Sequence, residues 1–290
     1  MLLGFDDYRV QSQALADALD IPCHIIRKHR FPDGENKLTL PPDLSGHVIF
    51  CRSLDHPNEK LLELLLAAKT ARELGAEVLT LVAPYLCYMR QDKAFQPGEA
   101  VSQQIVGKFL ADLFDNLITV DPHLHRIQYL EQAVPAASAV SLTATAQMAE
   151  FLAQRMQDPV LLAPDSEAEQ WVGAVAEPNQ WDYGVCEKLR SGDREVEIAL
   201  PDISLRGRAI VLVDDVASSG QTLAVATEKC LLKDASSVDV LVTHALLASD
   251  AKQRLLQAGV RNLWSSDSIS HESNVIHLSR MLGDAVSSLA

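Results

Sequence analysis

Four consecutive apolar residues at 210–213 are followed at once by two acids, a loop of small polar residues and a helical stretch. Such a short, uninterrupted apolar run is typical of a strand buried on both faces, as in a parallel sheet covered by helices. The segment 223–233, which follows the loop, has the pattern of a helix. This strand–loop–helix unit is the part of the chain that most strongly indicates an α/β fold.

Short apolar runs alternate with amphipathic stretches along the whole chain, which is the pattern of α/β proteins. Strands are expected at 47–51, 78–83, 117–120, 159–163, 182–186, 209–213, 238–243 and 262–265. Helices are expected at 8–19, 58–74, 101–113, 144–156, 166–176, 222–234, 249–258 and 276–286.

Two domains are expected from the length of 290 residues. A stretch rich in Pro, Ala and Ser before Ser141 indicates the boundary, which gives domains at 1–141 and 142–290, each a mostly parallel sheet flanked by helices. Segments 61–86 and 225–247 share a pattern of helix, tight turn and apolar strand. The shared pattern hints at two similar halves, although unrelated helix–strand units would also look alike.

Composition excludes several classes of function. The net charge of −14 argues against a nucleic-acid or anionic-membrane surface. Five scattered Cys without a C-x-x-C pair indicate reduced thiols in a cytoplasmic protein. The N-terminus lacks the basic region of a signal peptide, and no apolar run reaches the roughly 18 residues of a membrane span.

The loop at 217–222 has the chemistry of a phosphate cradle. A loop of small residues that opens a helix presents free N–H groups and the positive end of the helix dipole. Asp214 and Asp215, placed where the strand is expected to end, can accept hydrogen bonds from neighbouring sugar hydroxyls. Two plainer interpretations stay open, since Ser at this point can merely cap a helix and the acids can bind a metal.

The same stretch resembles the 5-phosphoribosyl 1-diphosphate (PRPP) motif of type I phosphoribosyltransferases and of PRPP synthetases. The resemblance implies that Asp214 and Asp215 hold the ribose diol. It implies that the 5-phosphate is cradled by Ser218, Ser219, Gly220 and Thr222. The Ser-Ser-Gly form of the loop does not separate a synthetase from a transferase.

Two stretches of the first half resemble PRPP synthetases alone. Residues 31–35 follow the FxDGE motif, although Pro32-Asp33-Gly34 also fits a simple turn. The resemblance places Phe31 against the adenine of ATP in a neighbouring subunit, with Asp33 and Glu35 hydrogen-bonded to it. Residues 84–102 follow PYxxYxRQDxxxxxGExxS, which assigns ATP binding to Arg90, Gln91 and Asp92.

Three further stretches continue the resemblance. Residues 121–128 are similar to DLHxxQIQ, whose His approaches the Mg²⁺ on ATP, and His123 takes that position while Pro122 and Arg126 depart from the pattern. Asp165 matches an acid that helps to hold Mg²⁺, but the glycines that usually follow are absent, and it can instead cap a helix.

The charged segment 185–198 is expected to be a mobile loop joining two strands, or a plain solvated hairpin. It resembles the catalytic flexible loop of the synthetases. By that match, Lys188 and Arg190 stabilise the negative charge that develops on the transferring group.

The resemblance covers roughly residues 4–290 and implies two tandem phosphoribosyltransferase-like domains. The implied activity is ribose-phosphate diphosphokinase: transfer of the diphosphoryl group of Mg-ATP to ribose 5-phosphate, with Mg²⁺ as cofactor. A homo-oligomer is implied, with a dimer as the smallest unit and a tetramer or hexamer possible. Two alternatives stay open: a PRPP-consuming phosphoribosyltransferase, and a non-catalytic, synthetase-like regulatory protein.

Overall fold

The computed structural model describes residues 1–124, 126–191, 195–248 and 250–289, and for 188–191 and 195–197 it describes the backbone alone. The chain forms two compact units, one of residues 1–142 with 278–290 and one of residues 143–277. This division differs from the expected domains because the C-terminal helix belongs with the first unit. The apolar side of this C-terminal helix packs on the first α-helix of the chain, and the local sequence pattern does not predict this contact.

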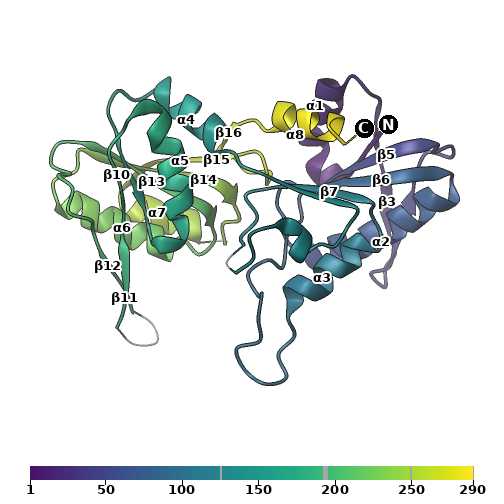
Figure 1. Cartoon of the computed structure of the whole chain (residues 1–290), viewed down its shortest axis with the longest axis horizontal. Helices are drawn as coiled ribbons and strands as arrows, with labels where there is room; N and C mark the ends of the chain where they lie inside the picture. The colour runs from purple at the N-terminus through teal and green to yellow at the C-terminus, as the bar shows by residue number, and fades with distance from the viewer. Residues whose placement is uncertain (125, 192–194, 249, 290) are drawn as a thin grey trace. The chain divides into compact units, whose positions relative to one another are not determined.

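The first unit is built on a six-stranded parallel sheet in the order β2-β1-β5-β6-β7-β8. Its strands are β1 (Leu2–Gly4), β2 (Cys23–Ile25), β5 (Gly46–Cys51), β6 (Ala76–Val82), β7 (Asn116–Val120) and β8 (Ser138–Leu142). Its helices are α1 (Arg9–Leu19), α2 (Pro57–Glu73), α3 (Ser102–Ala111) and α8 (Ser279–Ser287). In Figure 1, α1 and α8 cover one face of this sheet, and α2 and α3 cover the other.

The second unit is a six-stranded parallel sheet in the order β10-β9-β13-β14-β15-β16. Its strands are β9 (Val160–Ala163), β10 (Tyr183–Val185), β13 (Ala209–Ala217), β14 (Ser237–Ala245), β15 (Val260–Ser266) and β16 (Asn274–Ile276). Its helices are α4 (Thr145–Ala153), α5 (Glu169–Ala176), α6 (Gln221–Leu232) and α7 (Ala251–Gln257). Helix α4 packs on α5, and α6 packs on α7.

Each unit also carries a separate antiparallel hairpin. In the first unit the hairpin is β3 (Arg27–Arg30) with β4 (Asn36–Thr39), and in the second it is β11 (Glu187–Ser191) with β12 (Glu195–Ala199). In each unit the hairpin follows the second strand of the main sheet along the chain and precedes the third. The two units therefore repeat one topology, and the similar segments 61–86 and 225–247 occupy equivalent places in it, at α2–β6 and α6–β14.

The expected α/β class is confirmed, and the sheets are mostly buried because their strands are apolar on both faces. In β13 the residues from Ile210 to Val213 are all fully buried, as the sequence predicted. The expectation that this strand ends at 213 is wrong: it continues to Ala217, because pairing with β14 continues as far as Ala217 opposite Ala245.

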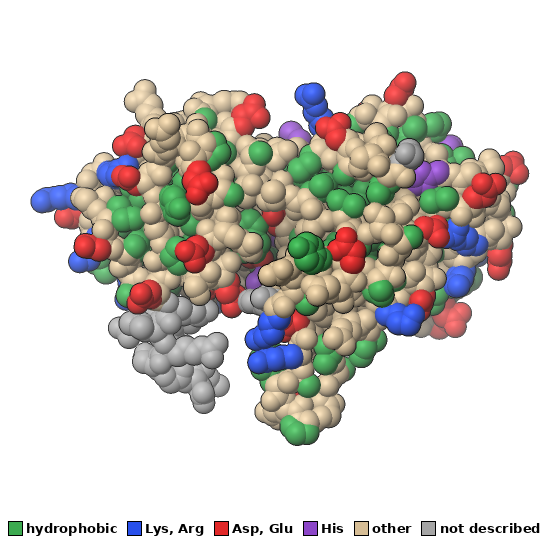
Figure 2. All heavy atoms as spheres, viewed as in Figure 1, with side chains coloured by type: hydrophobic (Ala, Val, Ile, Leu, Met, Phe, Trp, Pro, Cys, Tyr) green, Lys and Arg blue, Asp and Glu red, His purple; other side chains and the backbone are tan. Residues whose placement is uncertain are grey.

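No helix in the described ranges has the length and apolar character that a membrane crossing requires. On the face drawn in Figure 2, basic side chains stand singly or in small groups among acidic ones and form no continuous basic surface.

Candidate functional site

The predicted phosphate cradle is a tight bend between β13 and α6. Gly220 caps α6 with a φ of 70°, a left-handed conformation that favours glycine. The Gln221 N–H donates to Ser219 Oγ over 3.4 Å, so one serine of the loop does turn toward the helix start. The carbonyls of Ser218 and Ser219 are held from the other side, by the Ala248 N–H at 3.0 Å and by Arg254 Nη1 at 2.7 Å. The bend is therefore fixed at both of its serines.

The two acids of the motif lie inside β13, two and three residues before its last residue, Ala217. Asp215 is 2% exposed, and its N–H donates to Asp214 Oδ1 over 2.9 Å. Burial raises the pKa of Asp214 well above its ordinary value, and the negative charges of Asp215 and Asp165 raise it further. A group that resists ionisation in this way needs a positive charge or hydrogen-bond donors from a ligand to become a stable carboxylate.

Asp165 comes two residues after β9, which pairs directly with β13. Its side chain accepts a hydrogen bond from the Glu167 N–H at 3.1 Å and so caps the short 3-10 helix Ser166–Ala168. The predicted helix at 166–176 consequently begins with this 3-10 turn, and the α-helix starts at Glu169. The capping interpretation is confirmed, and the same carboxylate also contributes to the field at Asp214.

The sequence did not single out a third group of polar residues, at the ends of β14 and β15. The carbonyl of Thr243 accepts hydrogen bonds from Ser266 Oγ at 2.6 Å and from Ser268 Oγ at 2.8 Å. His244 Nδ1 lies 2.8 Å from Ser268 Oγ, and all of these side chains are buried. Polar residues directly after the apolar residues 240–242 and 263–264 were the available signal.

Lys188 and Arg190 lie on β11, opposite Ile198 and Val196 of β12. Their side chains, and the loop at 192–194, lie outside the described residues. Of the two interpretations of segment 185–198, the structure bears out the hairpin, because β11 and β12 pair antiparallel. Its second strand packs against α6, where the Lys229 ammonium group donates to the Ile198 carbonyl.

In the first unit, the FxDGE segment forms the turn of the β3–β4 hairpin. The Phe31 N–H donates to the Glu35 carbonyl at 2.8 Å, and Asp33 Oδ1 accepts from the Glu35 N–H at 3.1 Å. Phe31 is 39% exposed, and its ring meets His29 edge-on with centroids 4.8 Å apart. The turn predicted from the sequence is therefore present, with an aromatic ring accessible at the tip.

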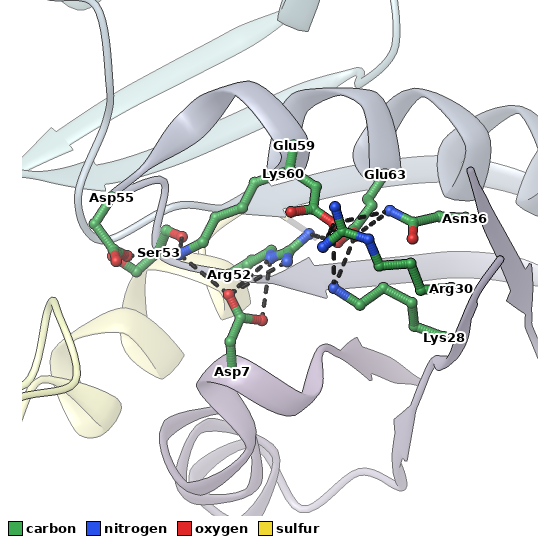
Figure 3. A network of polar contacts seen from close by, with 10 residues as sticks. All are labelled: Asp7, Lys28, Arg30, Asn36, Arg52, Ser53, Asp55, Glu59, Lys60 and Glu63. Carbon is green, nitrogen blue, oxygen red and sulfur yellow. Dashed lines mark hydrogen bonds and ion pairs between the residues drawn. The ribbon is translucent and has the colours of Figure 1, made fainter. Parts of the chain in front are cut away.

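A network of charged side chains attaches this hairpin to α2 (Figure 3). Glu63 of α2 is fully buried; Lys28 Nζ and Asn36 Nδ2 of the hairpin each lie 3.0 Å from its Oε1. The neighbouring Glu59 accepts from Asn36 over 3.0 Å and lies 3.7 Å from Arg30. The position of the hairpin tip thus depends on two glutamates one helical turn apart.

The same network continues into the body of the unit. Arg52 at the end of β5 is 3% exposed, and its Nη1 lies 2.7 Å from Glu63 Oε2. It also pairs with Asp7 at 3.2 Å, and its guanidinium carbon lies 4.0 Å from the centre of the Phe5 ring. Lys60 extends the network to Asp7 at 3.1 Å.

The RQD segment follows β6. The carbonyl of Gln91 accepts from the Gln103 N–H at 3.1 Å, Arg90 is exposed, and the Asp92 side chain is 2% exposed. His123, which is half-buried, lies in the loop after the adjacent strand β7. The structure thus places the RQD segment and His123 after two neighbouring strands of the first unit, whereas Phe31, Asp33 and Glu35 lie on a separate hairpin.

No cluster of three or more His, Cys, Asp or Glu arranged to hold a metal occurs among the described residues.

Comparison with known proteins gives concordant results. Residues 1–113 match the family model for the N-terminal domain of ribose phosphate pyrophosphokinase. Ribose-phosphate pyrophosphokinase of Methanopyrus kandleri is 33% identical over 280 residues, which are 95% of this chain and 94% of that protein. The enzyme of Saccharolobus solfataricus is 33% identical over 264 residues, 89% of each chain.

A solved structure with the same fold is phosphoribosylpyrophosphate synthetase from Mycobacterium smegmatis. The TM-score is 0.85 at 19% identity, over 100% of this chain and 98% of that one. With relatives of this identity matched along almost the entire length, the chain belongs to the ribose-phosphate pyrophosphokinase family.

Proposed function

We propose that this chain is a ribose-phosphate diphosphokinase. It transfers the β,γ-diphosphoryl group of Mg-ATP to the anomeric hydroxyl of ribose 5-phosphate and releases PRPP and AMP. The observation that carries the proposal is the second unit's strand–bend–helix, where Asp214 and Asp215 precede a bend capped by Gly220 at the start of α6. Membership of the family supports the same activity.

In the proposed complex, ribose 5-phosphate is held at both ends. The carboxylates of Asp214 and Asp215 accept hydrogen bonds from the ribose diol, which compensates the burial and the neighbouring negative charge that raise the pKa of Asp214. The 5-phosphate takes the N–H groups at the start of α6, where the helix dipole favours an anion. The proposed phosphate ligands are Ser218, Ser219, Gly220 and Thr222.

We assign ATP to the first unit. The accessible ring of Phe31 stacks on the adenine of ATP bound by a neighbouring subunit, and Asp33 and Glu35 of the same hairpin turn hydrogen-bond that base. The phosphates are met by the segment of Arg90, Gln91 and Asp92. A guanidinium such as that of Arg90 suits this task because it can donate two parallel hydrogen bonds to a phosphate.

His123 and Asp165 are the residues that we assign to Mg²⁺, one in each unit. The crowded carboxylates around Asp214 fit a cation, because a positive charge there removes the cost of ionising them. When bound, Mg²⁺ neutralises charge on the phosphates of ATP.

The chemistry asked of the protein is positioning and charge stabilisation. The anomeric oxygen attacks the β-phosphorus in line as AMP departs, so the protein forms no covalent intermediate. We assign the charge that stabilises the transferring group to Lys188 and Arg190 of the β11–β12 hairpin. Closing this hairpin over the substrates would exclude the water that otherwise hydrolyses ATP.

The direct test is to incubate the protein with ribose 5-phosphate, ATP and Mg²⁺ and to measure AMP and PRPP. We expect turnover, and we expect Lys188→Ala to slow it by roughly 100-fold or more while ATP binding persists. Lys252→Ala is the matched control, because Lys252 lies on α7 in an exposed ion pair with Glu272. Failure to form AMP from any pentose phosphate would favour the regulatory alternative, and transfer of ribose phosphate from PRPP to a base would favour the transferase.

The assembly belongs to the same proposal. We propose a homo-oligomer with a dimer as its smallest competent unit, and a cytoplasmic location. Sedimentation of the purified protein tests the first point, since a monomer that retains full turnover would contradict it.

A further inference from the structure

Arg126 is one of the two residues at which segment 121–128 departs from the synthetase pattern, which has Gln at that position. In the structure its Nη1 lies 2.5 Å from Asp92 Oδ1 and 2.7 Å from Asp92 Oδ2. The two residues are 34 positions apart, and each lies in a loop that follows a strand of the first unit. The departure from the pattern thus coincides with a specific long-range contact.

The loops joined by this contact are those to which we assign the phosphates of ATP. Asp92 ends the segment Arg90–Gln91–Asp92 after β6, and Arg126 is three residues beyond His123 after β7. Strands β6 and β7 are hydrogen-bonded neighbours, so their carboxyl ends lie side by side. An ion pair between the loops therefore fixes the phosphate-binding segment relative to His123.

The different exposure of the two side chains indicates what the loss of Arg126 would change. The Asp92 side chain is 2% exposed, whereas that of Arg126 is 51% exposed. A carboxylate with so little access to water depends on nearby donors, and a charged donor makes the stronger hydrogen bonds. Loss of Arg126 would therefore displace Asp92, and Arg90 and Gln91 with it, rather than unfold the protein.

We infer that Arg126 is a positioning residue for nucleotide binding, which acts through Asp92 on the segment 90–92. This inference rests on the proposed function. The experiment separates this inference from two competing explanations. One is a direct contact between Arg126 and the nucleotide, and the other is an effect of the Arg126 charge alone.

The experiment compares Arg126→Gln, Arg126→Lys, Asp92→Asn and the double variant Arg126→Gln/Asp92→Asn. For Arg126→Gln we expect the KM for ATP to rise about tenfold, as for the loss of one charge-assisted hydrogen bond, with kcat changed by less than about threefold. The KM for ribose 5-phosphate should not change. Arg126→Lys should restore part of the loss, because Lys keeps a charged donor.

The double variant distinguishes the explanations. If Arg126 acts through Asp92, adding Arg126→Gln to Asp92→Asn should raise the KM for ATP no further. Additive losses would overturn the inference, because they would show that Arg126 reaches the nucleotide by contact or charge without Asp92. An unchanged KM for ATP in Arg126→Gln would overturn it as well.

Arg9→Gln is the control, since the Arg9 side chain is 58% exposed, similar to Arg126, but pairs at 2.7 Å with an exposed acid, Asp6 of the 3-10 helix Asp6–Tyr8. It should leave all kinetic constants unchanged, and the midpoint of thermal unfolding should stay the same in both single Arg-to-Gln variants. Calorimetric binding of Mg²⁺ with a non-hydrolysable ATP analogue keeps the two proposals separate. A wild-type protein that turns over while Arg126→Gln binds the analogue normally contradicts the inference alone, whereas a wild type without binding and turnover contradicts both.

Discussion

The buried ion pair between Arg52 and Glu63 allows a quantitative prediction. The two side chains are 4% and 0% exposed, and their charged atoms lie 2.7 Å apart. Each has a second partner, Asp7 for Arg52 at 3.2 Å and Lys28 for Glu63 at 3.0 Å. Replacing one member leaves the other charge buried with only part of its compensation.

Removing one partner of a buried pair typically costs about 3–5 kcal/mol. Because a second partner remains in each case, we expect Arg52→Met and Glu63→Leu each to lower the free energy of unfolding by about 3 kcal/mol. The double variant buries neither charge, and the charges left behind on Asp7 and Lys28 are 37% and 42% exposed. We therefore expect it to lose no more than either single variant, which is a coupling of about 3 kcal/mol.

The assay exploits the distribution of tryptophan. All three Trp, at 171, 181 and 264, belong to the second unit, 143–277. Urea unfolding followed by far-ultraviolet circular dichroism reports on both units, whereas tryptophan emission reports on the second unit. The variants should shift the dichroism transition, and a separate tryptophan transition that stays in place would assign the loss to the first unit.

Two results would refute this reasoning. Single losses below about 1 kcal/mol would mean that the pair behaves like a surface salt bridge. A double variant that loses the sum of the single losses would show that the two charges do not compensate each other. The double variant also removes Glu63 as the partner of Lys28 and Asn36. It should lose no more stability than either single variant, but its KM for ATP should be higher than that of the wild type, because the hairpin that carries Phe31 is no longer held.

Three more predictions concern Asp214, Gly107 and the five cysteines. Because burial and two neighbouring carboxylates raise the pKa of Asp214, its ionisation at neutral pH opposes folding. Asp214→Asn should therefore have a higher urea midpoint than wild type at pH 7, and the difference should shrink as the pH falls toward about 4. The variant should also lose ribose 5-phosphate binding in calorimetry. A lower urea midpoint than wild type at pH 7 would contradict the stability prediction. A Cβ at Gly107 would lie 1.8 Å from the Ala133 carbonyl oxygen, so Gly107→Ala should cost about 3 kcal/mol or more by dichroism, and an unchanged midpoint would contradict the packing of α3. With a thiol reagent at pH 8, the native protein should react at most at Cys23, and all five thiols should react in urea. Burial raises the pKa to about 12 at Cys87, Cys186 and Cys230.

The longer elements could be predicted from sequence because their periodicity is local. Every helix expected between 8–19 and 276–286 is present, with ends shifted by a few residues. The strands that were missed are short or polar. Strands β1, β2 and β16 have three residues each, too few for a periodic signal, and β8 lies next to the Pro/Ala/Ser-rich stretch. Such strands form because a neighbouring strand supplies the hydrogen bonds, not because their own residues demand it.

The features of the candidate site likewise fall into those that the sequence could predict and those that it could not. Motifs that are contiguous in the chain, such as the acids and bend at 214–222, could be found because the residues that act together are neighbours in sequence. The raised pKa of Asp214 could not, since its main cause is burial in the folded unit, to which Asp215 and Asp165, in the segment after β9, add negative charge. Nor could the partner of Arg126, 34 residues away, be identified before the parallel neighbours β6 and β7 were known.

The repeated topology gives the Arg126 contact a counterpart. Strands β6 and β7 of the first unit correspond in sheet order to β14 and β15 of the second. The carboxyl-terminal parts of β14 and β15 are joined by buried, neutral hydrogen bonds to the Thr243 carbonyl, from Ser266 at the end of β15 and from Ser268 just after it.

The equivalent loops of the first unit are joined by an ion pair in which Arg126 is half exposed. Both units thus join the carboxyl-terminal sides of the same two neighbouring strands, the second unit within the strands and the first through the loops that follow them. Since salt screens a half-exposed ion pair more than a buried neutral hydrogen bond, the loops assigned to ATP are joined by the contact that ionic strength weakens more. The affinity for the nucleotide should therefore fall with ionic strength in wild type, and this fall should be smaller in Arg126→Gln. The hydrogen bonds to the Thr243 carbonyl should add no salt dependence.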